Sequence, residues 1–326
     1  MASFFRTALA GALALAGFTG IAAHAQAPAY PSRPVTIVVP FGPGGSADVY
    51  ARQLAQKLGQ ETGQSFIVDN KPGAGAVIGT QYVAKAAPDG YTLLMMSNTQ
   101  TVNESLLKKK PYELMRDFVA VAPVNEAPLA LVVRSQLPVK SIQDLVKQAK
   151  AEPGKFNFAS SGTGTPYHMA GELFKSMAGI DIVHVPYKTS GAARSDVLGG
   201  QVQMMFDAVS TMAELTANGS MRALATSGDK RSNVMPDVPT MAEAGYPGYT
   251  ATLWLGILAP KGTPQAIVDT LNQKIAKIVQ EPEVRATWAK SGVAPMKMTP
   301  AEFHTFLQQD IVKWGKIVDS AHITVE

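Results

Sequence analysis

Short apolar runs and helical patterns follow one another along most of the chain. Residues 35–39 form a run of β-branched residues, and Pro40 ends it. The apolar positions from Ala47 to Leu58 then recur with the spacing of one helix face, and residues 41–45 in between are rich in glycine. This pattern predicts a buried strand, a glycine-rich loop and a helix in direct succession.

The same succession returns in the second half of the chain. Residues 156–160 predict a strand, residues 161–166 a loop of small residues, and residues 167–177 a helix. Aligning Gly45 with Gly164 also aligns apolar positions of the two helices, for example Leu54 with Leu173. Strand and helix patterns alternate after each copy, which predicts an α/β protein with two doubly wound parallel sheets.

The chain is expected to pass twice between the two halves. Apolar runs at 129–133 and 253–258 predict a strand at each passage, and a short helix is predicted to begin near Pro236. The second passage is followed by three predicted helices, at 264–279, 282–291 and 300–320, the first of them capped by Thr263. These helices leave no strands for a third sheet. Residues 26–128 and 252–326 are therefore predicted to form one lobe, and residues 129–251 the other.

Both glycine-rich loops are suited to bind an anion. The first amides of a helix have no partner within the helix and carry part of the positive end of its dipole. A side chain at Gly45 is expected to block a ligand from these amides and to demand a backbone φ that suits only glycine. No lysine follows Gly45, so the loop is not a Walker A nucleotide site. The glycines at 73, 75 and 79 depart from the dinucleotide-binding pattern.

Residues 1–25 are predicted to be a cleavable secretory signal. Arg6 is their only Lys, Arg, Asp or Glu residue, residues 8–21 are apolar, and Ala23 and Ala25 fit the small-residue cleavage rule. The apolar run falls short of the roughly 20 residues that span a membrane. The chain has no cysteine, which excludes disulfides, and its formal net charge of +4 is compatible with a small anionic ligand.

Ten short motifs carry a resemblance to a known family. They are YPSRP (30–34), VPFGPGG (39–45), NKPGAG (70–75), APDGYTLL (87–94), RDF (116–118), ASSG (159–162), HVPYK (184–188), LGGQV (198–202), DVPT (237–240) and APKGTP (259–264). With Asp48 and His168, they cover essentially the whole chain after the signal. The chain resembles the Bug-type, TctC-like solute receptors of tripartite tricarboxylate transporters.

The resemblance implies a bilobed periplasmic-binding-protein fold of type II, with two hinge crossings. It implies a monomeric periplasmic receptor that closes on a small mono- or dicarboxylate and delivers it to the membrane permease subunits. Relatives hold one carboxylate between the first loop of each lobe, largely through backbone amides and ordered waters. No cofactor, metal or catalytic residue is implied.

Carried over, the ligand lies between residues 41–48, here called the first loop, and residues 160–168, the second loop. Residues 97–99 and 207 are expected at the far end of the cleft. The predicted ligand-binding residues are Phe41, Gly42, Pro43, Gly44, Gly45, Ser46, Ala47, Asp48, Ser97, Asn98, Thr99, Ser160, Ser161, Gly162, Thr163, Gly164, Thr165, Pro166, His168, Tyr187 and Asp207.

Three of these side chains have alternative roles. Asp48 would repel an anion that it faced, so it is expected to cap its helix or hold the first loop. His168 either caps and packs, or contacts the ligand. Asp207 either favours a ligand that carries an amine or hydroxyl group, or makes a contact between the lobes.

Two other classes of protein share part of this pattern. An exported hydrolase would need an elbow such as Gly-x-Ser-x-Gly, and the nearest stretch, residues 160–162, does not match it. A signalling receptor would have the same fold and a different membrane partner. No pair of histidines has metal-ligand spacing. The identity of the carboxylate is left open by the sequence.

Overall fold

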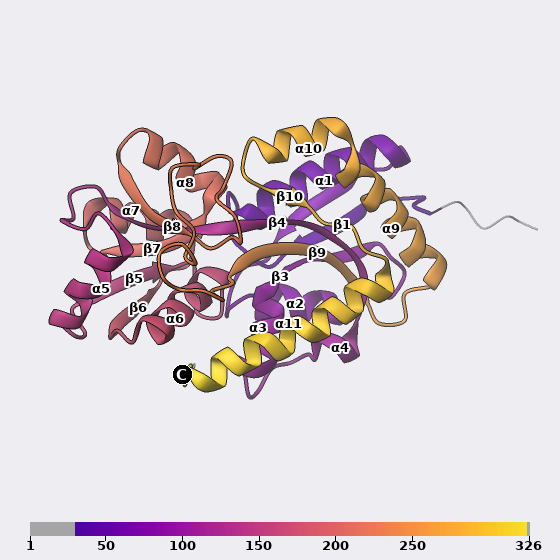
Figure 1. The fold of residues 1–326 in the computed structure, drawn as a ribbon. Helices are drawn as coiled ribbons and strands as arrows, with labels where there is room; N and C mark the ends of the chain where they lie inside the picture. The colour runs from indigo at the N-terminus through magenta and orange to yellow at the C-terminus, as the bar shows by residue number, and fades with distance from the viewer. Residues whose placement is uncertain (1–29, 325–326) are drawn as a thin grey trace, which may run out of the picture.

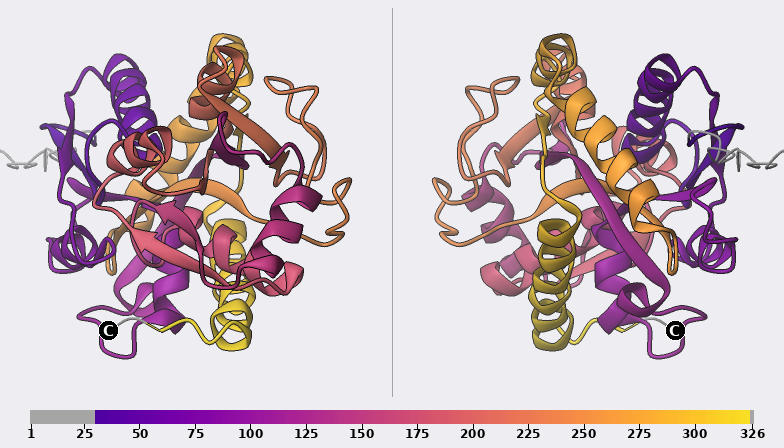
Figure 2. Two further views of the ribbon diagram at one scale, coloured as in Figure 1. Left: turned by 90° about the vertical axis from the view of Figure 1, so that its left-hand side faces the viewer. Right: turned by 90° about the vertical axis from the view of Figure 1, so that its right-hand side faces the viewer.

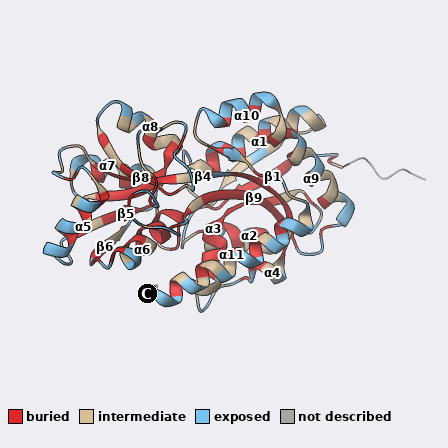
Figure 3. Cartoon of the chain, viewed as in Figure 1, coloured by how far each residue is buried: buried red, intermediate tan, exposed pale blue. Residues whose placement is uncertain are grey.

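A computed structural model describes residues 30–324, so the predicted signal at 1–25 lies outside the described residues. The chain forms two groups of strands and helices that lie side by side (Figure 1). We call the group that contains β1 the first lobe and the group that contains β5 the second lobe. In both, the central strands are buried and the outward faces of the helices are exposed (Figure 3).

The first lobe combines the beginning and the end of the chain. Its strands are β1 (Val35–Val39), β2 (Phe66–Asn70), β3 (Thr92–Ser97), β9 (Thr252–Pro260) and the short β10 (Ala294–Pro295). Its helices are α1 (Ser46–Thr62), α2 (Val77–Ala84), α3 (Asn98–Leu106), α4 (Leu114–Asp117), α9 (Gln265–Gln280), α10 (Pro282–Ala289) and α11 (Pro300–Ser320). The tail packs on the first lobe, as predicted, and α11 runs along its outside (Figure 2).

The second lobe repeats the strand–loop–helix plan. Its strands are β5 (Phe156–Ser160), β6 (Ile182–Pro186), β7 (Met204–Ala208) and β8 (Met221–Thr226). Its helices are α5 (Ile142–Ala151), α6 (Pro166–Ala178), α7 (Ser190–Gly199) and α8 (Val209–Ala217). In the first lobe β1 pairs in parallel with β2 and β3, and here β5 pairs in parallel with β6 and β7. Parallel strands joined through helices give both lobes the predicted doubly wound plan.

One long strand belongs to both lobes. β4 (Phe118–Arg134) pairs with β9 up to Pro128 and with β7 and β8 from Leu129 onward, so the strand order runs β2-β1-β3-β9-β4-β7-β5-β6. The sequence predicted only its second part. Pro123 and Pro128 hid the first part, because proline interrupts a strand pattern. Shifts of register on either side of Pro123 accommodate it.

Two other predictions of local structure are wrong. The segment after Pro236 forms turns, with Thr240 bridged to Thr226, instead of a helix. Thr263 does not cap α9; its hydroxyl donates to the carbonyl of Pro260 at 2.8 Å. Strand β7 begins at Met204 and contains Asp207. By contrast α11 has its predicted bounds, because Thr299 and Glu302 form a capping box.

A buried carboxylate joins α11 to α3. The hydroxyl of Thr101 donates to Oδ2 of Asp310 at 2.6 Å, and Asp310 is 7% exposed. Burial raises the pKa of Asp310, against the hydrogen bond from Thr101, which lowers it. The folded chain therefore holds a proton on this group more readily than the unfolded chain does.

The stability of the wild type relative to the Asp310→Asn variant is expected to depend on pH. The contribution of Asp310 is fully present below its ordinary pKa of about 3.9 and is lost as pH rises through the raised value. Urea denaturation of both proteins between acid and neutral pH measures the difference. A free-energy difference that stays constant over this range would contradict the assignment.

Candidate functional site

The first loop is fixed by an acidic side chain. Gly44 has a φ of +78°, and its amide donates to Oδ2 of Asp48 at 3.0 Å. Asp48 is 4% exposed and forms an ion pair with Arg52 at 2.8 Å. Burial alone would raise the pKa of Asp48, but hydrogen bonds from Arg52 and Gly44 lower it. Asp48 thus stays ionised and holds the loop, one of the two roles expected for it.

The second loop is built in the same way, with a histidine in place of the aspartate. Gly164 also has a φ of +78°, and its amide donates to Nδ1 of His168 at 3.1 Å. Nε2 of His168 lies 3.6 Å from Glu172, and the ring is 3% exposed. Both ring nitrogens therefore face protein atoms, which supports the packing role for His168.

The matching glycines differ by one residue from the predicted alignment. Gly44, and not Gly45, corresponds to Gly164, because the two share the left-handed φ and the hydrogen bond to the side chain four residues on. Gly45 has a φ of −82°, which any residue adopts. A Cβ at Gly45 would meet only the carbonyl of Gly42, at an ordinary 3.7 Å. The backbone strain predicted for a side chain at Gly45 is thus not supported.

The first turns of α1 and α6 present unpaired amides. In α1 the first backbone bond within the described residues comes from Val49, which donates to Gly45 at 3.0 Å. The amides of Ser46 and Ala47 have no hydrogen-bond partner among residues 30–324. The same holds for the amides of Tyr167 and His168 at the start of α6. Each helix therefore offers N–H donors at the positive end of its dipole.

The two loops lie close to the opposite lobes. A Cβ added to Gly164 would come within 2.9 Å of Leu106 and 3.2 Å of Asn103, both on α3 of the first lobe. A Cβ on Gly42 would come within 3.2 Å of Thr189, which caps α7 in the second lobe. The lobes are thus in contact on both sides of the loops.

A polar cluster spans the lobes beside these helix starts. Nη1 of Arg194 on α7 donates to Oδ2 of Asp207 at 3.2 Å, and the amide of Ala208 donates to Oδ1 at 2.8 Å. The hydroxyl of Tyr167 lies beside Asp207 and Ser46. Burial raises the pKa of Asp207 to about 6, although Arg194 opposes the shift. Burial, with the neighbouring Asp207 carboxylate, also raises the pKa of Tyr167.

Two stacked histidines lie at the second loop. The rings of His168 and His184 lie 3.8 Å apart between centroids, and Phe158 stacks on His184 at 4.9 Å. Nε2 of His184 lies 2.6 Å from the hydroxyl oxygen of Ser160. Burial, with His168 nearby, lowers the pKa of His184 to about 3, so its ring is neutral at physiological pH.

The remaining predicted residues serve mainly local structure. Ser97 and Gln100 form the capping box of α3, and Thr99 lies within the helix. Nδ2 of Asn98 donates to the carbonyl of Thr252 on β9 at 2.9 Å, while its buried Oδ1 has no partner among the described residues. The hydroxyl of Tyr187 donates to Asp196 at 2.6 Å. Burial is the main cause that raises the pKa of Tyr187 to about 12, and this hydrogen bond is the second.

The sequence missed two residues of this region. Tyr167 follows Pro166 in the first turn of α6, and that position could have suggested it. Asn103 donates from Nδ2 to the carbonyl of Gly75 at 2.9 Å, which holds the 73–76 turn over the second loop. A Cβ on Gly75 would come within 3.3 Å of the carbonyl of Thr163. No local pattern indicates this contact, because it joins three distant segments.

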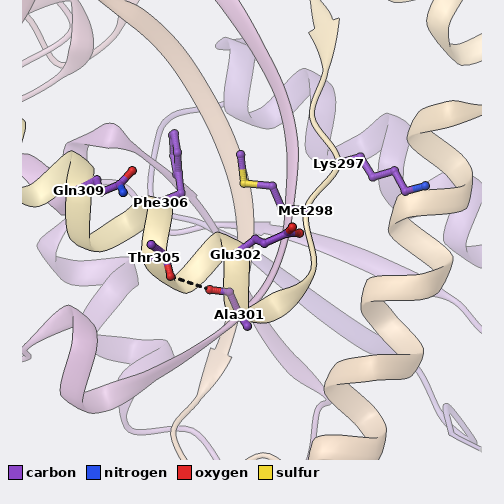
Figure 4. A pocket seen from close by; sticks show the side chains of 7 residues that line it. All are labelled: Lys297, Met298, Ala301, Glu302, Thr305, Phe306 and Gln309. Carbon is purple, nitrogen blue, oxygen red and sulfur yellow. Dashed lines mark hydrogen bonds between the residues drawn. The ribbon is translucent and has the colours of Figure 1, made fainter.

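A surface hollow lies away from both loops. Its volume is about 520 Å³, and Figure 4 shows its lining, which is Lys297, Met298, Ala301, Glu302, Thr305, Phe306 and Gln309. These residues belong to α11 and the segment before it, and none is in either loop. Within residues 30–324 no group of three His, Asp or Glu side chains could hold a metal ion. No helix in the described part of the chain is both long and apolar enough to cross a membrane.

Solved structures show the class of protein to which this fold belongs. The chain resembles the periplasmic binding protein BugD with a TM-score of 0.86 and 32% identity, covering 91% of this chain and all of that one. It resembles Rpa4515 of R. palustris, solved with adipate, with a TM-score of 0.87 and 34% identity, over 90% of this chain and 99% of the other. MatC from Rhodopseudomonas palustris, solved with bound malate, gives 0.84 and 31%, over 89% and 100%. The fold is that of a two-lobed periplasmic binding protein, which confirms the predicted fold class.

Sequence comparison then gives the family. The pattern of the "Tripartite tricarboxylate transporter family receptor" matches residues 50–323. Protein BugT of Bordetella pertussis is 42% identical over 301 residues, which is 92% of each chain. The protein from the tcbD-tcbE intergenic region of Pseudomonas sp. strain P51 is 38% identical, over 96% of this chain and 93% of the other. The chain belongs to the TctC family of solute receptors, as the resemblance predicted.

Proposed function

We propose that this protein is a periplasmic receptor that closes its two lobes on a small mono- or dicarboxylate. It then delivers the ligand to the membrane permease subunits of a tripartite tricarboxylate-type transporter. One observation carries the proposal: the unpaired amides of Ser46, Ala47, Tyr167 and His168 start two helices that belong to opposite lobes. Relatives solved with adipate and malate support the choice of ligand class.

A carboxylate suits these donors for physical reasons. Hydrogen bonds from backbone N–H groups to a charged acceptor are stronger than neutral ones, and bridging waters can complete them at little cost. The negative charge nearest the first loop, on Asp48, is paired with Arg52. The oriented dipoles of the two helix starts therefore attract an anion. Such binding is reversible, as a transport receptor requires.

The proposed binding residues are those of the two loops, with Ser97, Asn98, Thr99, Tyr187 and Asp207 nearby. The proposed lobe boundaries follow 128 and 251, and the change of partners along β4 after Pro128 supports the first of them. The signal at 1–25, its cleavage and the monomeric state are part of the same proposal. The hydroxyl of Ser160 contacts Nε2 of His184, but this contact does not indicate a hydrolase, because Ser160 is fully buried.

A thermal-denaturation screen of carboxylates on the mature protein tests this function. A ligand at 100 times its dissociation constant is expected to add about 2.7 kcal/mol to the free energy of unfolding. The amide of the same acid is the control, because it has the same shape and no charge. The proposal is wrong if no carboxylate stabilises the protein, or if acid and amide stabilise it equally.

A further inference from the structure

The polar cluster between the lobes presents hydrogen-bond donors that the protein itself does not use. Arg194 has five N–H donors, and one of them bonds to Asp207. Its Nε and Nη2 groups have no hydrogen-bond partner in the described part of the chain. The side chain of Arg194 is 20% exposed. The guanidinium is thus held at one end and open to a ligand at the other.

The acceptor in this cluster is covered. Asp207 is 1% exposed, and each of its oxygens already accepts a hydrogen bond, one from Ala208 and one from Arg194. An ammonium group of a ligand cannot reach it without breaking these bonds. The hydrogen-bond partners of Asp207, Ala208 and Arg194, lie with it in the second lobe, so these bonds are not the contact between the lobes that the sequence left open.

The cluster lies next to the two helix starts that form the proposed carboxylate site. Tyr167 is in the first turn of α6, and its hydroxyl lies beside Ser46 in the first turn of α1. The Nη2 end of Arg194 lies beside Gly191 in the first turn of α7, and the cap of that helix, Thr189, faces Gly42 of the first loop. A ligand held by the helix starts therefore has Tyr167 and Arg194 as neighbours.

We propose that Arg194, positioned by Asp207 and assisted by Tyr167, binds a second carboxylate of the ligand and makes the receptor selective for dicarboxylates. This inference rests on the proposed function and narrows it. A guanidinium offers paired N–H groups that match the two oxygens of a carboxylate. The covered carboxylate of Asp207 offers no free acceptor to an ammonium group. Asp207 acts through Arg194 and does not touch the ligand.

Isothermal titration with two matched pairs of acids tests the proposal. The pairs are adipate with hexanoate and succinate with butyrate, which differ in the second carboxylate and share their chain length. The wild type is expected to bind one of the dicarboxylates at least tenfold more tightly than its partner. Arg194→Leu is expected to weaken that dicarboxylate about ten- to a hundredfold and to leave the monocarboxylate within about twofold. The affinity of Arg194→Lys for that dicarboxylate is expected to lie between those of the wild type and of Arg194→Leu. Lysine keeps the positive charge and loses the paired N–H groups.

Two further variants keep the result interpretable. Arg285→Leu removes an exposed positive charge on α10 and is expected to bind all four acids as the wild type does. Arg194→Leu combined with Asp207→Asn avoids a buried unpaired carboxylate and is expected to show the same loss if the single variant does not fold. Equal binding of both acids by the wild type, or equal weakening of both by Arg194→Leu, overturns the inference and leaves the proposed function standing. Failure of the wild type to bind any carboxylate overturns both.

Discussion

Gly164→Ala is expected to abolish the compaction that a saturating carboxylate produces in solution scattering. The added Cβ would come within 2.9 Å of Cδ2 of Leu106 and 3.2 Å of Asn103 on the opposite lobe, so it obstructs the contact between the lobes. Without closure the ligand keeps the donors of one helix start and loses those of the other. A helix terminus contributes up to about 2 kcal/mol to a partly buried anion, so affinity is expected to fall about thirtyfold.

The matched control for Gly164→Ala is Gly179→Ala, at the other end of the same helix. Gly179 has a φ of +58°, and a Cβ there meets nothing within 4 Å. Both substitutions cost about 1–2 kcal/mol of backbone strain, and only the first obstructs the other lobe. Gly179→Ala should therefore lose stability and still close on its ligand. A Gly164→Ala protein that compacts normally would show that the closed contact is not required.

Gly171→Ala is expected to lower the free energy of unfolding by about 1–3 kcal/mol, although alanine is normally favoured inside a helix. A Cβ on Gly171 would clash with the ring of Phe158. That ring is fully buried and stacks on His184, which in turn stacks on His168 beneath the second loop. Moving Phe158 therefore disturbs these stacked rings at the second loop, and the affinity for the carboxylate should fall as well. Chemical denaturation and titration calorimetry measure the two effects.

Gly199→Ala on α7 provides the comparison, because a Cβ there meets nothing within 4 Å. This variant should be neutral or more stable by up to about 1 kcal/mol. Adding Phe158→Leu to Gly171→Ala makes room for the new methyl group, so the double variant should lose less than the sum of the two single losses. Strict additivity would mean that the clash with Phe158 is not the cause.

The local parts of the fold could be predicted from the sequence because each carries its own pattern. Both strand–loop–helix units and α11 are of this kind, and both loops of the candidate site came from the same reasoning. The first half of β4 could not be predicted, since the cost of Pro123 and Pro128 is offset by register shifts against β9. That compensation depends on a partner strand about 130 residues away in the chain.

The one-residue error in aligning the two loops has a similar origin. Helix α6 has apolar residues on two neighbouring faces, so hydrophobicity alone allowed it to be aligned with α1 in either of two ways. The structure buries Phe174 and leaves Met177 38% exposed, which matches Leu54 to Phe174 rather than to Leu173. The pairing of Arg194 with Asp207 was not predicted, because it joins a helix to the end of a strand and has no local signal.

The continuous strand β4 determines how this molecule can move. In the first lobe β4 and β9 run antiparallel as a paired ladder from Phe118 to Pro128, which reaches the boundary between the lobes. A two-stranded ribbon twists readily and resists sliding. We therefore expect the lobes to open by a torsion of this ribbon rather than by rotation about a single residue. Such a motion would bring the two helix starts back to the same relative position each time the lobes close.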